Sequence, residues 1–476
     1  MSSTVVLFFI LYLVAMIGVG IWAAARRHTE LDFDLAGRQH GTLITALSAS
    51  ASSESAFVLL GMVGIAYRTG VNCLWILLGG LLGYSLNWFV VGNRVRHLSQ
   101  QADLRTLPQI LAHGCPGGWH RLIRTVASLI ALVFLLSYVS AQFNAAGKAF
   151  DSMFNIDYKW GVWLGLIIVL SYAARGGLRS VGLTDAIQAG MMVVVVLILP
   201  LAGLIKVGGP SGLRDALAAI DPSLAHGAAG ATGWAGVGVV ISWVALGLAY
   251  PGQPHVIDKF MSARDSKVFQ TAPWIGIIWF QLVYLAAITL GLVARVEYSH
   301  IEAIAFDPEN TLPVLATSLF PAVLGGLALA AIIAAMASTA DSQLVAASTC
   351  VATDLLPRRQ ILGLSEVRIR VIILVLLGTV AGVFATTENR VIFKFVLYAW
   401  ISLGAALGPA MLYVLHIRRR SPLAILGGIV TGLVGSIALD GSSYQLAGSF
   451  AASVLVIAVV HLLARLTNGV TSDDTI

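Results

Sequence analysis

The chain has few charged residues and few cysteines. Lys, Arg, Asp and Glu make up 11% of its 476 residues, whereas an ordinary soluble domain has roughly 25%. Such a low charge content excludes a soluble protein, and the short connections between apolar stretches leave no room for a soluble domain of normal size. The three cysteines, Cys73, Cys115 and Cys350, have no metal-ligand spacing and are predicted to be free thiols.

Apolar runs dominate what is present: 58% of the residues are hydrophobic and the mean hydropathy is +0.87. A helix that crosses a bilayer needs ~20 mostly apolar residues, and thirteen stretches meet this requirement. We therefore expect an all-α polytopic membrane protein of about 13 transmembrane helices. The predicted spans are residues 4–25, 41–67, 72–93, 121–146, 158–174, 183–207, 232–258, 269–294, 317–352, 366–386, 391–416, 421–440 and 446–466.

Basic residues are concentrated in alternate connections between these spans. Arg26 and Arg27, Lys259 with Arg264, and the run from Arg418 to Arg420 all fall in one set of connections, and the other set holds fewer. Cytoplasmic loops are enriched in Lys and Arg, so the amino terminus is predicted outside and the carboxyl terminus inside. The sequence pI of about 9.3 therefore reports topology, and no nucleic-acid partner is expected.

Ser48–Ser55 is a polar run with one carboxylate, Glu54, inside the second predicted span. Irregular backbone at membrane depth survives only against protein or a cavity, and a central carboxylate adds a penalty of ~2.5–3.5 kcal/mol on insertion scales. A face of small residues for helix packing would explain the serines. It does not explain Glu54, so the run indicates a binding site.

A second span is interrupted by two prolines and two glycines in residues 247–255. Proline removes a backbone donor and clashes with the preceding turn, so this helix must kink or unwind. After the first span, the two interrupted spans are the first and sixth of ten, which predicts two five-helix halves of inverted topology. The predicted divisions are an extra helix at 4–25, repeats at 41–207 and 232–416, and two final helices at 421–466.

The ninth span carries Ser338, Asp341 and Ser342 three and four residues apart, on one helical face. Hard oxygen ligands of this kind suit an alkali cation, although serines also bond back to carbonyls of their own helix. Asp185 lies near the start of the sixth span, where it serves either as a further ligand or as a helix cap.

The chain resembles the sodium:solute symporter family, most closely its bacterial sodium/proline branch. The resemblance rests on Thr45-Ala-Leu-Ser-Ala, Gly176-Gly-Leu with Thr184-Asp185, Gly252-Gln-Pro-His255, Met336-Ala-Ser-Thr339 with Gln343-Leu, and Glu388-Asn-Arg-Val391. It implies a leucine-transporter-like fold in a bacterial plasma membrane, sodium as the coupling ion without an organic cofactor, and a small solute, proline or another amino acid. A monomer surrounded by lipid is expected.

The resemblance also implies site residues. The principal sodium site would use backbone oxygens near Ala51, Glu54 and Ala335 with the hydroxyls of Ser338 and Thr339. A possible second sodium site would map to Asp185, Ser338, Asp341 and Ser342. The solute pocket is expected to involve Ser53, Glu54, Ser55, Tyr138, Leu246, Tyr250, Gln253 and Pro254.

Three of these positions depart from the proline branch, which has an aspartate in place of Ser53, an apolar residue in place of Glu54 and a tryptophan in place of Leu246. Glu54 is predicted either to replace the lost aspartate in ion coupling or to pair with an ammonium group of the solute. Loss of the indole at position 246 is predicted to enlarge the pocket.

Alternatives from other classes stay open at this point. Ser55 and His255 could be drawn as a hydrolytic pair, although no third orienting group is evident. A channel would need a continuous polar pore, and a solute sensor could reuse the same fold. Within transport, protons could replace sodium, or the solute could be a carboxylate. Sodium-dependent, concentrative uptake into sealed vesicles separates symport from these alternatives.

Overall fold

The computed structural model describes residues 3–25, 29–318, 321–356, 364–387 and 392–467. Over these ranges the chain is helical, and the strand-like pairing recorded there is one isolated bridge between His40 and Ala263. The Glu388–Val391 motif and two arginines used to predict the topology, Arg26 and Arg27, lie outside these ranges.

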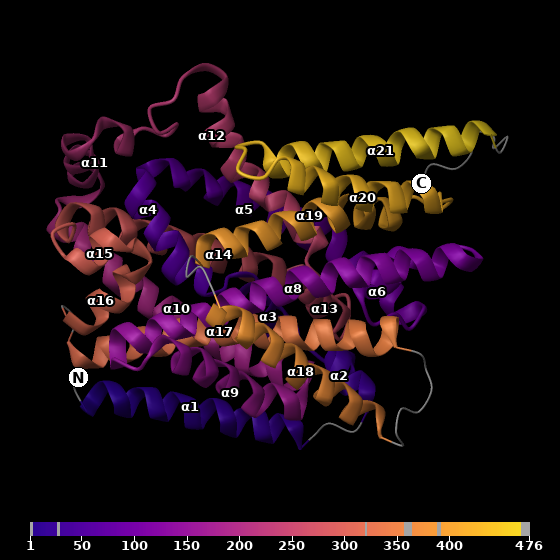
Figure 1. Ribbon diagram of the computed structural model, residues 1–476, viewed down its shortest axis with the longest axis horizontal. Helices are drawn as coiled ribbons and strands as arrows, with labels where there is room; N and C mark the ends of the chain where they lie inside the picture. Colours follow the sequence, from indigo (N-terminus) through magenta and orange to yellow (C-terminus); the bar gives the residue numbers. More distant parts are fainter. Residues whose placement is uncertain (1–2, 26–28, 319–320, 357–363, 388–391, 468–476) are drawn as a thin grey trace.

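The helices form one bundle (Figure 1). The α-helices are α1 Ser3–Ala24, α2 Glu30–Leu35, α3 Thr42–Ser53, α4 Val63–Thr69, α5 Trp75–Ser85, α6 Asn93–Gln101, α7 Leu107–Ala112, α8 Gly117–Phe154, α9 Tyr158–Gly176, α10 Leu178–Lys206, α11 Gly209–Ile220, α12 Gly233–Ala245, α13 Pro254–Met261, α14 Val268–Glu297, α15 Glu302–Phe306, α16 Thr311–Ser318, α17 Ala322–Cys350, α18 Glu366–Thr387, α19 Ile392–His416, α20 Pro422–Ala438 and α21 Gln445–Thr467. The 3₁₀ segments are η1 Ala36–Arg38, η3 Gly70–Leu74, η5 Pro222–Ala225, η6 Leu246–Gly252 and η7 Pro308–Asn310, and the π-helical segments are η2 Phe57–Met62, η4 Leu86–Gly92 and η8 Val351–Leu355.

The long helices run roughly parallel to one another, with α1 along one side and α20 with α21 along the opposite side (Figure 1). α17 lies in the interior and contacts α8, α10, α1, α18 and α3. Its sequence is rich in alanine, and nearly all of its side chains from residue 328 onward are buried. Small side chains allow helices in a membrane to approach closely, which explains the central position of α17.

Each predicted span coincides with a helix or an interrupted helix. Among the described residues, nine helices are long and apolar enough to cross a membrane by themselves, so the number thirteen and the division into two repeats stay predictions. The connection after residue 207 contains α11. Leu213 and Leu217, one turn apart on α11, are buried and hold it against the bundle.

Both predicted helix interruptions are confirmed. α3 is helical through Ser53, and the backbone leaves the helix at Glu54, with φ −105° and ψ 80°. The break is therefore shorter than the polar run suggested, because Ser48 and Ser52 send their hydroxyls to Asp185 instead of competing for backbone groups. In the second case α12 tightens into η6, Gln253 is extended, and α13 begins at Pro254.

Close contact between η6 and α5 depends on glycine. A Cβ on Gly247 would lie 2.0 Å from the carbonyl oxygen of Gly79, and a Cβ on Gly79 would lie 2.6 Å from that of Val244. Neither backbone can carry a side chain here without separating the helices. This packing places the interrupted part of the second broken helix beside α5 and the cavity described below.

At the other end of α3, buried ion pairs join elements that are distant in sequence. Arg370 of α18 binds Asp34 of α2 in bidentate fashion, with Nε to Oδ1 at 2.7 Å and Nη2 to Oδ2 at 3.0 Å. Arg105 lies 3.2 Å from the same carboxylate. Arg370 and Asp34 are almost fully buried, so this cluster fastens α18 to the segment that leads into α3.

Candidate functional site

The end of α3 meets the middle of α17 through backbone carbonyls and hydroxyls. Ser338 donates to the carbonyl of Ala51 at 3.1 Å and to that of Ala335 at 3.2 Å. Thr339 donates to the carbonyls of Ala51 and Ser52 at 3.3 and 3.2 Å. All of these residues are buried, so four of the five predicted sodium ligands meet at one place.

This group of oxygens suits an alkali cation. Carbonyl and hydroxyl oxygens are the ligands that hard cations take in proteins, and a helix interruption leaves carbonyls free to face an ion. The hydroxyls of Ser338 and Thr339 now point their hydrogens at carbonyls, and rotation about the C–O bond turns their lone pairs toward an ion instead. Glu54, the fifth predicted ligand, is the first residue beyond the helical end of α3, where its carbonyl is outside the helix.

The side chain of Glu54 points away from this junction and into a cluster of tyrosines. Its Oε1 accepts hydrogen bonds from Tyr84 at 3.1 Å and from Tyr250 at 2.7 Å, and Tyr284 is a further hydrogen-bond partner. The rings of Tyr84 and Tyr250 pack edge to face with centroids 4.8 Å apart. Of the two roles predicted for Glu54, this arrangement favours contact with a solute over direct contact with the coupling ion.

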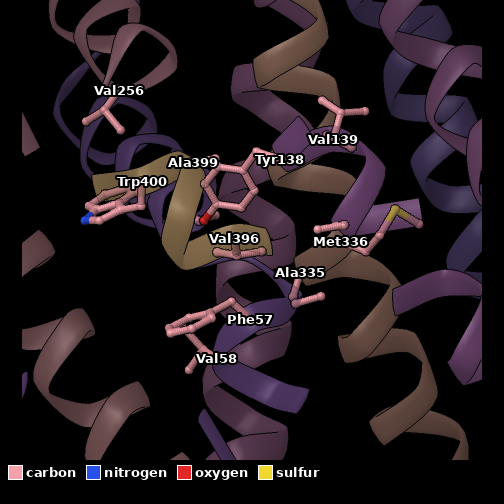
Figure 2. Close-up of a cluster of buried hydrophobic side chains, with 14 of the residues drawn as sticks. Phe57, Val58, Tyr138, Val139, Val256, Ala335, Met336, Val396, Ala399 and Trp400 are labelled. Carbon is pink, nitrogen blue, oxygen red and sulfur yellow. The ribbon is translucent and has the colours of Figure 1, made fainter. Parts of the chain in front are cut away.

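Glu54 also lines a cavity of about 30 Å³, which has room for about one or two water molecules. Figure 2 shows Phe57, Tyr138, Val396 and Trp400 around this region. The cavity is lined by Ser53, Glu54, Phe57, Ile76, Gly80, Tyr138, Leu246, Gly247, Tyr250, Phe280, Tyr284, Val396, Leu397 and Trp400. Six of these fourteen residues are aromatic, and Glu54 carries the one carboxylate of the lining.

Trp400 of α19 is a wall of this cavity that the sequence reasoning missed. Its Nε1 donates to the carbonyl of Leu246 at 3.1 Å, and its ring packs edge to face on Tyr250 with centroids 4.8 Å apart. Trp400 therefore supplies an indole next to Leu246, and the enlargement of the pocket by leucine at position 246 stays a prediction. A tryptophan in the middle of an apolar span was the available signal.

The other predicted solute residues divide into two groups. Ser53, Tyr138, Leu246 and Tyr250 line the cavity with Glu54. Ser55, Gln253 and Pro254 are buried behind that lining, within the part of the chain that the structure describes. These three residues support the lining residues and do not themselves line the cavity.

These supporting contacts are specific. Ser55 accepts a hydrogen bond from Tyr138 at 3.3 Å, and Gln253 donates to the carbonyls of Ala249 and Trp400 at 3.2 and 3.0 Å. Within the described residues no hydrogen bond joins Ser55 to His255. The geometry therefore offers nothing for the hydrolytic pairing.

Asp185 and Ser342, two of the predicted second-site residues, lie 3.3 Å apart. Asp185 is inside α10, which begins seven residues earlier at Leu178, so the helix-cap interpretation is wrong. Asp341 points elsewhere and accepts a hydrogen bond from Tyr172 at 2.8 Å. Ser338 remains at the Ala51 junction.

A lysine occupies the place between Asp185 and Ser342. The Nζ of Lys259, on α13, lies 3.0 Å from Asp185 Oδ2 and donates to Ser342 Oγ at 2.7 Å. From its position in the sequence, Lys259 was predicted to be a loop charge that reports topology. That interpretation is wrong, because the lysine side chain has 0% exposure.

Comparisons with known proteins agree with this architecture. The family model described as the sodium:solute symporter family matches residues 33–434. The osmoregulated proline transporter OpuE of Bacillus subtilis is 30% identical over 478 residues, covering 98% of this chain and 96% of that protein. The high-affinity proline transporter PutP of the same organism is 31% identical over 469 residues, covering 96% and 98%.

Among solved structures, a Na⁺-coupled sialic acid symporter in its substrate-bound, outward-open state has a TM-score of 0.82 with this chain. The two are 16% identical in sequence, and the match covers 97% of this chain and 98% of that one. This likeness confirms the leucine-transporter-like fold.

Proposed function

This chain belongs to the sodium:solute symporter family, and from that premise and the geometry of the site we propose that it takes up proline, or a closely related amino acid, together with sodium. It is a secondary active transporter of a small solute and not an enzyme. The observation that carries the proposal is the convergence of Ser338 and Thr339 on the Ala51 carbonyl at the interrupted end of α3.

The proposed sodium site consists of the carbonyl oxygens of Ala51, Glu54 and Ala335 and the hydroxyls of Ser338 and Thr339. Sodium bound there would join α3 to α17 and fix the backbone at Glu54. Because the Glu54 side chain lines the cavity, ion binding at its carbonyl would set the position of its carboxylate. This is the proposed physical link between ion and solute. The second predicted cation site, at Asp185, Asp341 and Ser342, is proposed to hold a cation as well. The candidates for this place are a sodium ion and the ammonium group of Lys259.

Solute recognition is proposed to rest on Glu54 and the surrounding rings. A carboxylate fixed by Tyr84 and Tyr250 is suited to the ammonium group of an amino acid, and aromatic faces attract the same cation. Proline fits this description, and the relatives named as proline transporters support it. Ser53, Tyr138 and Leu246 complete the proposed pocket, with Ser55, Gln253 and Pro254 behind them.

The cavity of about 30 Å³ is too small for an amino acid, so solute entry requires the pocket to widen. Trp400 lies on α19 and closes the chamber against Leu246 and Tyr250. We infer that α19 and the interrupted α12–α13 helix separate when solute enters. Rocking of one group of helices against the other then exposes the site to alternate sides of the membrane.

Two thermodynamic relations govern the coupling between sodium and solute. Sodium must raise solute affinity by the same factor by which solute raises sodium affinity, typically 5–150-fold for ~1–3 kcal/mol of coupling. Each positive charge that moves inward through 100 mV contributes ~2.3 kcal/mol. The number of ions per solute therefore determines the attainable solute gradient.

The remaining assignments extend the same proposal. We place the protein in a bacterial plasma membrane with the amino terminus outside and the carboxyl terminus in the cytoplasm, as the loop charges predict. Residues 41–207 and 232–416 form the two inverted repeats. The protein works as a monomer in lipid, with no organic cofactor and no nucleic-acid partner.

Reconstitution tests this function. Purified protein in sealed liposomes is supplied with radiolabelled proline, a panel of other amino acids, glycine betaine and small carboxylates, with and without an inward sodium gradient. We expect concentrative proline uptake that collapses when the sodium gradient is dissipated. Uptake driven by a pH gradient without sodium would establish proton coupling instead, and sodium-dependent binding without uptake would indicate a sensor.

A further inference from the structure

Lys259 lies in the interior of the bundle, two residues before the end of α13. Its side chain has 0% exposure, and its Nζ contacts Asp185 Oδ2 at 3.0 Å and Ser342 Oγ at 2.7 Å. The three residues come from α13, α10 and α17. A lysine ammonium in such surroundings needs paired oxygen acceptors, since an unpaired buried charge is strongly unfavourable.

The carboxylate oxygen that Lys259 contacts accepts hydrogen bonds from several other side chains. Asp185 Oδ2 also accepts hydrogen bonds from Ser48 at 2.7 Å, from Ser52 at 3.1 Å and from Ser342 at 3.3 Å. The other oxygen, Asp185 Oδ1, is buried and has no hydrogen-bond partner among the described residues, and the same holds for Asp341 Oδ1. Unfilled acceptor capacity therefore remains on the carboxylates of Asp185 in α10 and Asp341 in α17.

These are the residue types that would bind an alkali cation: one carboxylate, several hydroxyls and a second carboxylate nearby. The ammonium nitrogen, however, already lies at hydrogen-bond distance from both Asp185 and Ser342. A sodium ion bound by the same two oxygens would share its position with the ammonium, and two positive charges a few ångströms apart in a dry interior repel strongly. The ammonium and a sodium ion are therefore alternatives at this place.

We propose that Lys259 is a resident cation that takes the place of a second sodium ion, so that a single sodium ion, bound at Ala51, Ser338 and Thr339, accompanies each solute molecule. The inference rests on the proposed function and goes beyond it by fixing the ion number. The covalently held ammonium joins α13 to α10 and α17 permanently, which is the connection that a second ion would otherwise make and break in every cycle.

The wild-type ion number is the first test and needs no variant. In proteoliposomes with a clamped membrane potential, the opposing solute gradient that just stops net flux gives the number of sodium ions per solute. We expect one sodium per solute and a Hill coefficient for sodium near one. A value of two sodium ions per solute in the wild-type protein would overturn the proposal.

The Lys259→Met variant removes the ammonium but keeps an unbranched side chain. We expect sodium to enter beside Asp185, so the ion number rises to two and the Hill coefficient increases toward about two, its limit for two sites. The double variant Asp185→Asn/Lys259→Met removes both charges and should stay at one sodium. A folded Lys259→Met protein that still moves one sodium per solute would contradict the proposal.

Lys148→Met is the matched control for loss of a buried lysine. Lys148 pairs with Asp307 at 2.8 Å and with Glu309, in a cluster separate from Asp185. We expect this variant to be less stable, with its sodium number unchanged. An equal gain of sodium in the control would show that the effect of Lys259→Met is not local.

Sodium-dependent thermal stabilisation of the purified proteins separates this inference from the proposed function. Even if no solute in the panel is transported, titration with sodium at constant total salt should show one saturating step for wild type and a second step for Lys259→Met. The absence of sodium-driven uptake would overturn the proposed function alone. Two steps in the wild-type protein, or one step in folded Lys259→Met, would overturn the lysine inference alone.

Discussion

Glu54→Gln tests how the solute is recognised. The substitution removes one negative charge from the cavity and keeps nearly the same shape. Glutamine retains a carbonyl oxygen that can accept the hydrogen bonds now donated by Tyr84 at 3.1 Å and Tyr250 at 2.7 Å. The fold and the sodium junction should therefore survive, and the lost interaction is the ion pair with the solute ammonium.

The size of the effect follows from this contact. Hydrogen bonds to charged groups contribute ~1.5–3 kcal/mol, so loss of the charge should raise the KM for proline about 10- to 150-fold, at ~1.4 kcal/mol per factor of ten. Initial rates of radiolabelled proline uptake at saturating sodium measure this change. The apparent affinity for sodium, measured at saturating proline, should change much less.

Tyr84→Phe is the control for disturbance of the tyrosine cluster. It removes one hydrogen bond to Glu54 and leaves the charge, so a neutral-bond loss of ~0.5–1.5 kcal/mol predicts an increase in KM of about 2- to 13-fold. If Glu54→Gln leaves KM within twofold of wild type, or if Tyr84→Phe has the larger effect, the proposed ammonium contact is wrong.

Three further predictions concern the ion, the packing and the stability of the bundle. Ser338→Ala removes one sodium ligand and should weaken apparent sodium affinity about 10-fold or more, at ~1.5–3 kcal/mol for a bond to a charged group. Ser348→Ala on the same helix, whose hydroxyl bonds back to Val345 at 2.9 Å, should leave sodium dependence unchanged, and equal effects would contradict the site. Gly247→Ala places a Cβ 2.0 Å from a backbone oxygen, so we expect a destabilisation of ~1–3 kcal/mol from overpacking and a loss of uptake. Thermal unfolding in detergent measures the first and a transport assay the second. A normal melting temperature would refute the close approach of η6 to α5. Asp34→Asn leaves the buried Arg370 without its bidentate partner and should cost ~3–5 kcal/mol, seen as a lower melting temperature, whereas unchanged stability would show that the pair contributes little.

The sequence was sufficient for the fold because hydropathy and helix breakers act locally. Twenty apolar residues predict a span wherever they occur, and the prolines at 251 and 254 interrupt a helix in any context. Ser338 could be predicted on a cation-binding face of α17 because Asp341 and Ser342 follow it three and four residues later, whereas Thr339 was indicated only by the family resemblance. Family resemblance then supplied the carbonyl of Ala51 as their partner.

The sequence could not show which way a side chain points or which residues of other helices it contacts. The side chain of Glu54 faces the tyrosines because the backbone leaves the helix at that residue, and no spacing rule fixes that rotation. Trp400 lines the cavity from α19, 154 positions after its hydrogen-bond partner Leu246. Its role therefore depends on how the helices pack. Lys259 was predicted to be a loop charge because it follows an apolar run. Its burial depends on contacts with Asp185 of α10 and Ser342 of α17, which are distant in sequence.

Equilibrium binding of radioactive sodium to the purified protein tests the central claim most directly. Wild-type protein and the Ser338→Ala/Thr339→Val double variant are compared at constant ionic strength in choline, after both are shown to be folded. We predict saturable binding to wild type that proline strengthens, and loss of that binding in the double variant. Equal, proline-independent binding by the two proteins would contradict a sodium ion at the junction of α3 and α17.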